Sequence, residues 1–422
     1  MKAVGAGWDP EQMPLVRYRR VLSRPAIRQA LLLGFLVRMP IFAGGVVLTL
    51  HVVATLDRTY AAAGLVSAAA TIAIAISGPW RGRLLDTMGL RRVVVPSIVV
   101  AAVCWSIAPF AGYWPLLALA SLAGLFVIPS FSIIRQAVIA AVPEDDRRTA
   151  ISLDSVAVEL SFMVGPAAGV WAATVWPTSW VLFTIEMFGA AAGILLWIAN
   201  PVIREASEET LLDDGSVLPP VPVRRTDWFR APFIAICLGA AAATVVLGGS
   251  DIAIVAALRE FKAQSSIGWV LAVWGLGSLV GGLVYGGLHR SISAFWLLGG
   301  LGLVTAPMAL AAGAPSLAVL SFVAGLLCAP TLTATIDQVS RVVPSTARGE
   351  AMGWHGSFMT AGMALGAPVS GVAIDRWGWS AGFALVAVVG VVVAVAGASA
   401  GRVRRHRRHR RHRRVASAAA RA

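Results

Sequence analysis

The sequence predicts an all-α membrane protein with twelve transmembrane helices in two pseudo-symmetric six-helix bundles. Apolar residues make up 58% of the 422 residues and charged residues only 13%, whereas a soluble domain carries roughly 25% charged residues. The apolar residues gather in long runs, and the second half of the chain repeats a pattern of the first half. Both features are typical of duplicated helical bundles in a membrane.

The apolar runs predict the individual helices. A helix needs about 20 mostly apolar residues to cross a bilayer, and runs of this kind occur between charged residues and prolines. The first run follows a basic segment, as a signal peptide would, but it is too long for one and contains Arg38, so we expect a retained helix. The twelve runs are 27–53, 61–84, 93–111, 115–142, 150–175, 180–199, 232–256, 266–288, 295–312, 316–343, 351–374 and 381–398.

A repeat with an offset of 201 positions relates the two halves. Duplicated halves inside a membrane are typical of secondary transporters, which bind their substrate between the halves. The matched pairs are Gly124 with Gly325, Pro129 with Pro330, Val142 with Val343, Pro143 with Pro344, Arg147 with Arg348, Ala150 with Ala351, Gly165 with Gly366 and, with one more residue of offset, Pro166 with Pro368, Gly169 with Gly371 and Val170 with Val372.

One long polar stretch divides the chain. Residues 201–230 combine prolines with mixed charge, which suits a flexible cytoplasmic linker. We therefore expect an amino-terminal bundle (1–200), this linker (201–230), a carboxyl-terminal bundle (231–400) and a polybasic cytoplasmic tail (401–422). The tail repeats Arg-Arg-His, and we expect it to be disordered and held near anionic lipid, where each cation contributes about 1 kcal/mol; RNA binding is the alternative.

The distribution of charge predicts the topology. A net charge of +14 would suggest nucleic acid as a partner of a soluble protein, but here the basic residues gather in the even-numbered loops and at the termini. By the positive-inside rule both termini are cytoplasmic, so we expect a multi-pass protein of the cytoplasmic (inner) membrane without a nucleic-acid partner. Its expected partners are a small-molecule substrate, protons and membrane lipid, and we expect a monomer.

The chain offers no catalytic or metal motif. Cys104, Cys237 and Cys328 each fall within an apolar run, without the spacing of a zinc or disulfide framework, and are expected to be small core residues. A Walker-type nucleotide loop and a nucleophile triad are absent from the sequence. We therefore expect no enzyme activity, no metal and no cofactor, and transport driven by an ion or substrate gradient.

The loop after the second run carries a recognisable pattern, with Gly82, Asp86 and Gly89 followed by Arg91 and Arg92. It resembles the loop signature of the major facilitator superfamily, whose bacterial efflux-like members the chain is most similar to. Asp86 is expected to receive free N–H groups at the start of the eleventh helix, near 348–351. The resemblance implies that this contact closes the cytoplasmic side; the alternative is that these charges only anchor the topology. The second half has lost the aspartate.

The fifth run contains Gly165, Pro166 and Gly169. This resembles the Gly-Pro-x-x-Gly-Gly motif that the family associates with exporters, with Val170 in place of the last glycine. The alternative interpretation is a kinked helix, because proline removes one helix hydrogen bond and glycine allows close packing.

Ionisable residues at membrane depth are costly and are therefore candidates for function. Arg135 and Glu159 lie at similar depths on neighbouring helices, so they could pair. The family resemblance favours Arg38, Arg135 and Asp337 as cavity residues, with Asp337 close to His355 and the leading candidate for proton coupling.

Two further charged residues, His51 and Asp251, lie near the outer ends of the first and seventh helices and could form an outer gate; a location at headgroup level is the alternative. Glu186 has no evident partner.

We expect a secondary active transporter that moves a small organic solute by alternating access, with proton-coupled export preferred. The alternatives are uptake of a nutrient or anionic metabolite, suggested by Arg38 and Arg135, and a transporter-like sensor that does not translocate.

Overall fold

The computed structural model describes residues 14–203, 224–288 and 291–419, and all regular secondary structure in these ranges is helical. The short helix α1 (Pro14–Leu22) precedes the amino-terminal bundle, and α9 (Arg225–Trp228) precedes the carboxyl-terminal bundle. The amino-terminal bundle consists of α2 (Pro25–Leu50), α3 (Tyr60–Met88), α4 (Leu90–Ile107), α5 (Tyr113–Leu125), α6 (Ser130–Ala140), α7 (Arg147–Val175) and α8 (Thr178–Ala199). The carboxyl-terminal bundle consists of α10 (Ala231–Glu260), α11 (Ile267–Gly287), α12 (Ala294–Thr305), α13 (Ala314–Val342), α14 (Arg348–Trp377) and α15 (Trp379–Ala419).

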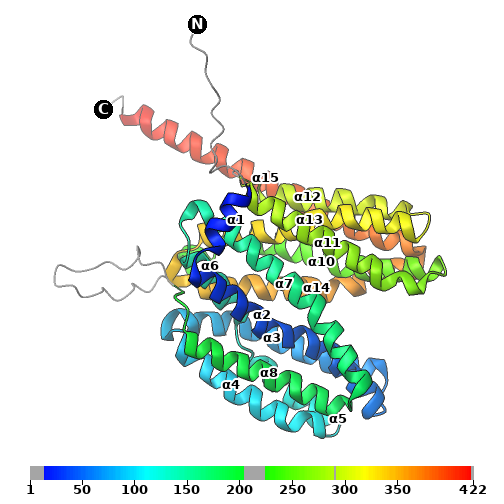
Figure 1. The fold of residues 1–422 in the computed structure, drawn as a ribbon. Helices are drawn as coiled ribbons and strands as arrows, with labels where there is room; N and C mark the ends of the chain where they lie inside the picture. Colours follow the sequence, from blue (N-terminus) through cyan, green and yellow to red (C-terminus); the bar gives the residue numbers. More distant parts are fainter. Residues whose placement is uncertain (1–13, 204–223, 289–290, 420–422) are drawn as a thin grey trace, which may run out of the picture.

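These helices confirm the predicted fold class. In the described ranges, 11 helices are long and apolar enough to cross a membrane, and Ala294–Leu310 forms a shorter apolar one at the predicted ninth position. Figure 1 shows the two bundles side by side, with α7 and α14 between them. The bundles meet at the end where α3 ends and α7 and α14 begin, called the linker end below. They diverge toward the opposite, or far, end.

The fourth predicted span is broken in two. Helix α5 ends at Leu125 and α6 starts at Ser130, because Pro129 has no N–H to donate and disfavours the helical conformation of the residue before it. The matching Pro330 lies inside α13, which remains one helix. The repeat in the sequence therefore does not extend to this detail of the backbone.

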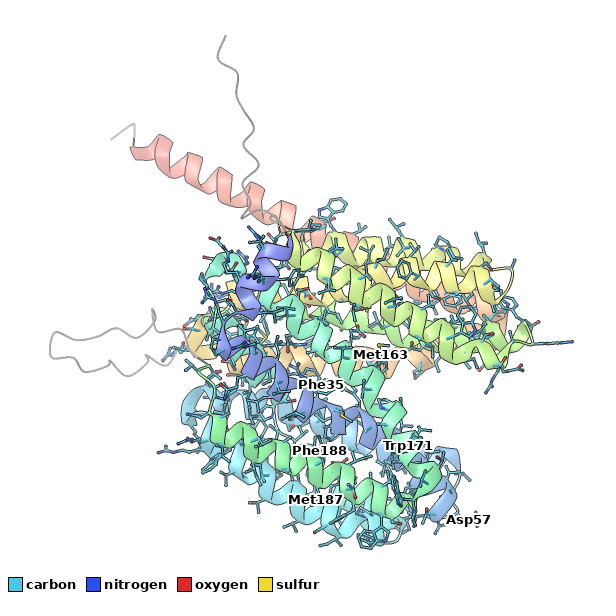
Figure 2. All side chains as sticks on the ribbon, in the orientation of Figure 1. Phe35, Asp57, Met163, Trp171, Met187 and Phe188 are labelled. Carbon is cyan, nitrogen blue, oxygen red and sulfur yellow. The ribbon has the colours of Figure 1, made fainter. Side chains whose placement is uncertain are left out.

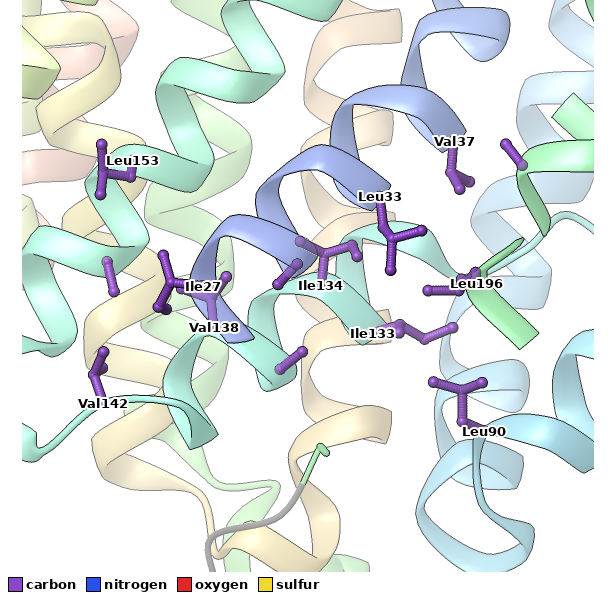
Figure 3. Close-up of a cluster of buried hydrophobic side chains, with 14 of the residues drawn as sticks. Ile27, Leu33, Val37, Leu90, Ile133, Ile134, Val138, Val142, Leu153 and Leu196 are labelled. Atoms are coloured by element: carbon purple, nitrogen blue, oxygen red, sulfur yellow. The ribbon is translucent and has the colours of Figure 1, made fainter. Parts of the chain in front are cut away.

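Each bundle has its own apolar core. Near the linker end of the amino-terminal bundle, buried side chains from α1, α2, α3, α4, α6, α7 and α8 form one cluster, which includes Ile27, Ile134 and Leu196 (Figure 3). Trp171 and Phe188 instead lie on the outside of the bundle (Figure 2), with exposed fractions of 63% and 43%. Large apolar side chains on the outer surface fit a molecule whose solvent is lipid.

The chain beyond the bundles is partly described. Residues 204–223 of the predicted linker lie outside the described ranges. The tail was expected to be disordered, but α15 continues as a helix to Ala419 and projects away from the bundle (Figure 1). The physical reason is that elongation of an existing helix avoids the cost of nucleation, and arginine is a good helix former.

Candidate transport site at the bundle interface

The bundles touch at the linker end through two close helix crossings. In the first crossing, Gly78 and Gly82 of α3 face Gly353 and Gly349 of α14. A Cβ atom at Gly82, Gly349 or Gly353 would overlap the backbone of the opposite helix, and one at Gly78 would lie 2.9 Å from the hydroxyl of Ser357. Glycines four residues apart let two helix backbones approach closely in a membrane, where no hydrophobic driving force holds helices together.

Asp86 lies at the end of this crossing. Its Oδ1 accepts a hydrogen bond from the N–H of Gly349 at 2.8 Å, and its Oδ2 accepts one from the N–H of Glu350 at 2.8 Å. These N–H groups belong to the first turn of α14, where no intrahelical acceptor exists and the helix dipole favours negative charge. The contact predicted from the loop motif is therefore present.

The other residues of the motif shape the loop. Gly89 ends α3 with φ of +79°, a conformation that favours glycine. Arg91 stacks on Trp197 of α8 at 5.4 Å from the ring centroid, and Arg91 and Arg92 are both exposed.

The second crossing, between α7 and α11, uses different chemistry. Arg148 donates to the carbonyl of Leu288 at 2.7 Å, Thr149 donates to that of Gly286 at 2.6 Å, and Ser152 donates to that of Gly282. The second half of the chain has lost the loop aspartate, and side chains of α7 supply the contact instead.

Glu159 lies further along α7. Its Oε1 accepts a hydrogen bond of 2.7 Å from the Oγ of Ser278 in α11, so the carboxylate bridges the two bundles. Asp251 of α10 lies close enough to interact electrostatically with Glu159. The predicted pairing of Glu159 with Arg135 is wrong, because Glu159 binds Ser278 of the other bundle whereas Arg135 approaches the carboxylate of Asp154.

The partner of the buried arginines is Asp154, which the sequence interpretation missed although it lies within the fifth apolar run. Arg38, fully buried, donates to both carboxylate oxygens of Asp154 at 2.5 and 3.3 Å. The Nε of Arg135 approaches the same carboxylate at 3.8 Å. Both guanidinium groups pack on the ring of Phe131, at 4.7 and 5.4 Å from its centroid.

A cavity of about 190 Å³ lies between α3, the break between α5 and α6, the first turns of α6, and α14. Two arginines line it, Arg135 and Arg81. Arg81 is 2% exposed and donates to the carbonyl of Val93 at 2.7 Å and to the hydroxyl of Ser97. Arg81 was not predicted as a site residue, although it lies within the second apolar run. Arg38, predicted to line the cavity, does not.

The predicted carboxyl-terminal site residues do not form one site. Asp337 accepts from the Nε of Arg341 at 3.1 Å, one turn along α13 and near the linker end. His355 is fully buried and its Nε2 lies 3.0 Å from the Oγ1 of Thr335. Thr335 and Asp337 are two positions apart on a helix and so face different ways, which is why Asp337 and His355 do not meet. Asp337 also does not line the cavity.

The predicted outer gate is also not formed in this structure. His51 is buried within the amino-terminal bundle, where its Nδ1 lies 2.9 Å from the Oγ1 of Thr178, whereas Asp251 interacts electrostatically with Glu159. Glu186 packs against Gly44 of α2.

The helix-5 motif packs the amino-terminal bundle internally. A Cβ atom at Gly165 would lie 2.7 Å from the carbonyl of Met39, and one at Gly169 would lie 2.9 Å from the side chain of Val47, both in α2. Pro166 lies in α7 with the two glycines.

Two helical bundles that close on each other at one end, around charged side chains at membrane depth, are the architecture of many secondary transporters. The model of the Major Facilitator Superfamily matches residues 30–250 and 236–420. The chain therefore belongs to this superfamily, and it is a multi-pass membrane protein that moves solutes.

Solved structures show the same fold at low sequence identity. The human organic anion transporter MFSD10 is 15% identical, with 90% of this chain and 99% of that chain covered and a TM-score of 0.65. A bacterial homologue of the iron transporter ferroportin in an outward-facing state is 16% identical, with 89% and 99% covered and a TM-score of 0.69. The transporter FucP in the outward conformation is 14% identical, with 88% and 97% covered and a TM-score of 0.64. No curated protein matches the chain by sequence.

Proposed function

We propose that this protein is a secondary active transporter that couples the export of a small organic solute to proton entry across the cytoplasmic membrane. The linker end faces the cytoplasm, because the loops at that end carry most of the lysine and arginine residues. The conformation, closed at the linker end and divergent at the far end, is then the outward-facing state of an alternating-access cycle. Export is supported by the helix-5 motif of Gly165, Pro166 and Gly169.

The observation that carries proton coupling is the hydrogen bond from Ser278 to Glu159 across the bundle interface. Proton movement can be linked to solute movement only if a group has different proton affinities in the two states. When the bundles rock, Ser278 and Asp251 move with the carboxyl-terminal bundle, so Glu159 changes its distance from its hydrogen-bond donor and from Asp251. Both changes alter the free energy of the ionised form relative to the protonated form.

Glu159 replaces Asp337 as the leading coupling residue. Asp337 is held by Arg341 of its own helix, so the movement of one bundle against the other leaves its closest partner in place. Glu159 is bound to the opposite bundle and lies deeper in the span. In the proposed cycle it takes up a proton from the far side and releases it to the cytoplasm.

Proteoliposomes that contain a pH-sensitive dye test this function. A panel of anionic, neutral and cationic small solutes is applied, and solute-induced proton flux is recorded together with exchange of each active, labelled solute between equal pools. We expect Glu159→Gln to keep exchange but to lose proton flux and accumulation driven by a pH gradient. Glu260→Gln, which removes an exposed carboxylate at the far end of α10, is the matched control. Full pH-driven accumulation by Glu159→Gln would contradict the proposal.

A further inference from the structure

Around Arg38, Arg81 and Arg135, the amino-terminal bundle carries more positive charge than the neighbouring Asp154 can neutralise. Asp154 is already held by Arg38 through two hydrogen bonds, and Arg135 only approaches it at 3.8 Å. Arg81 donates to neutral oxygens, a carbonyl and a hydroxyl. Arg38 and Arg135 thus share one carboxylate, and the acceptors of Arg81 are neutral, in a region at membrane depth where an uncompensated charge is costly.

Two of these cations line the cavity rather than the packed core. Arg81 and Arg135 are 2% and 5% exposed, and both border the space between α3, α6 and α14. The Nε atoms of both side chains are buried without a hydrogen-bond partner among the described residues. A group bound in the cavity could therefore receive hydrogen bonds from both arginines.

The start of α6 contributes further donors to the same cavity. The break at Pro129 places the first turn of α6 inside the membrane, where Ser130, Phe131 and Ser132 line the space and no side chain caps the helix. The N–H of Ser130 donates to the carbonyl of Ile128 at 2.6 Å. The N–H groups of Phe131 and Ser132, in the same first turn, lack intrahelical acceptors and favour a negative charge. The hydroxyl of Ser130 is also buried, at 1% exposure of the residue, and has no partner among the described residues.

The remaining walls of the cavity indicate the rest of the ligand. Ile41, Ile74 and Met359 give it apolar surface. At about 190 Å³ it is smaller than the roughly 300–1,000 Å³ of pockets for drug-sized ligands. A compact ligand with one anionic group and an apolar body fits this cavity, because the anionic group would bind the arginines and the body would contact the apolar walls.

We propose that this cavity binds a small organic anion, with Arg81, Arg135, the Ser130 hydroxyl and the first turn of α6 holding its carboxylate, phosphate or sulfonate group. The inference rests on the proposed transport function and names the class of substrate that this transporter would carry. Because Gly353 and Ser357 of α14 complete the cavity, the anion contacts both bundles near their closed end. Binding is therefore sensitive to the movement that alternating access requires.

The experiment measures equilibrium binding to the purified full chain in lipid nanodiscs. The probes are benzoate, phenyl phosphate and benzenesulfonate, with benzamide and benzylamine as neutral and cationic compounds of similar shape. We expect at least one of the three anions to bind about tenfold or more tightly than benzamide, since hydrogen bonds from charged donors have no counterpart in the neutral compound. The preferred anion identifies the head group.

Variants test the named donors. Arg135→Gln and Arg81→Gln should each weaken binding of the preferred anion about tenfold or more, whereas Arg58→Gln, which removes an exposed arginine at the far end, should leave it unchanged. Ser130→Ala, a small change that preserves folding, should weaken binding severalfold. If the arginine variants fold poorly, Ser130→Ala and the comparison of anions with benzamide in the wild-type protein decide the question.

The proposal is overturned if none of the anions binds more tightly than benzamide, or if the folded arginine variants keep wild-type affinity. Failure of the anion site can be distinguished from failure of proton coupling, because binding is measured without a proton gradient. Transport of a neutral solute with proton flux that depends on Glu159 would overturn the anion site and leave the proposed function intact.

Discussion

The contact of Asp86 with the first turn of α14 predicts a change in conformational equilibrium. Asp86→Asn keeps one acceptor oxygen but loses the second acceptor and the negative charge. A hydrogen bond to a charged group contributes about 1.5–3 kcal/mol, and a charge at a helix terminus contributes about 0.3–1 kcal/mol. For a partly buried carboxylate we expect a loss of about 2 kcal/mol from the closed linker end, which raises the ratio of open to closed molecules about 30-fold.

Distance measurements between paired spin labels can detect this shift. Met88 at the end of α3 and Val342 at the end of α13 are 46% and 42% exposed and belong to different bundles at the linker end. The cysteines Cys104, Cys237 and Cys328 are buried, so labels introduced at the two exposed positions can be attached selectively. We expect the variant to gain a population with a longer distance between the labels.

The matched control is Asp145→Asn, which removes an exposed carboxylate at the same end of the molecule. It should leave the distance distribution unchanged. If Asp86→Asn also gives the wild-type distribution, the hydrogen bonds to Gly349 and Glu350 do not stabilise the closed state, and the motif only shapes the loop.

Two further predictions concern stability. Asp154→Asn leaves buried arginines without their carboxylate and should lower the free energy of unfolding by about 3–5 kcal/mol. The double change Arg38→Met with Asp154→Leu should recover most of this loss. Equal thermal stability of Asp154→Asn and the wild type would argue against a structural pair. Gly165→Ala places a Cβ atom 2.7 Å from the carbonyl of Met39 and should lower the free energy of unfolding by about 1–3 kcal/mol. Gly371→Ala, where the added Cβ atom meets open space, should be tolerated. Similar melting temperatures for the two variants would contradict the close packing of α7 on α2.

The fold was predictable because its determinants are local or repetitive. The length of each apolar run fixes a membrane-spanning helix, and the repeat fixes the division into two bundles. The Asp86 contact was also predictable, since the loop motif and the free N–H groups at the start of α14 lie at the same end of neighbouring elements. These features depend on the depth of each residue along the membrane normal, which follows directly from its place in an apolar run or loop.

The pairing of buried charges was not predictable from depth alone. Arg135 and Glu159 lie at similar depths, but Asp154 and Glu159 are five residues apart and therefore about 140° apart around α7. Asp154 faces the arginines of its own bundle, and Glu159 faces Ser278 of the other. Which way a helix is rotated follows from packing against its neighbours. The sequence of one chain does not specify it.

The face of α7 toward the carboxyl-terminal bundle connects the two proposed roles of that helix. Its contacts recur every three or four residues: Arg148 and Ser152 bind carbonyls of α11, Ser155 lies 2.9 Å from the hydroxyl of Thr333 in α13, and Glu159 binds Ser278. This spacing places all four on one side of a helix. The contact that closes the linker end and the carboxylate proposed to carry the proton therefore belong to the same helix crossing. A change of charge at Glu159 is therefore expected to act directly on the crossing of α7 with α11.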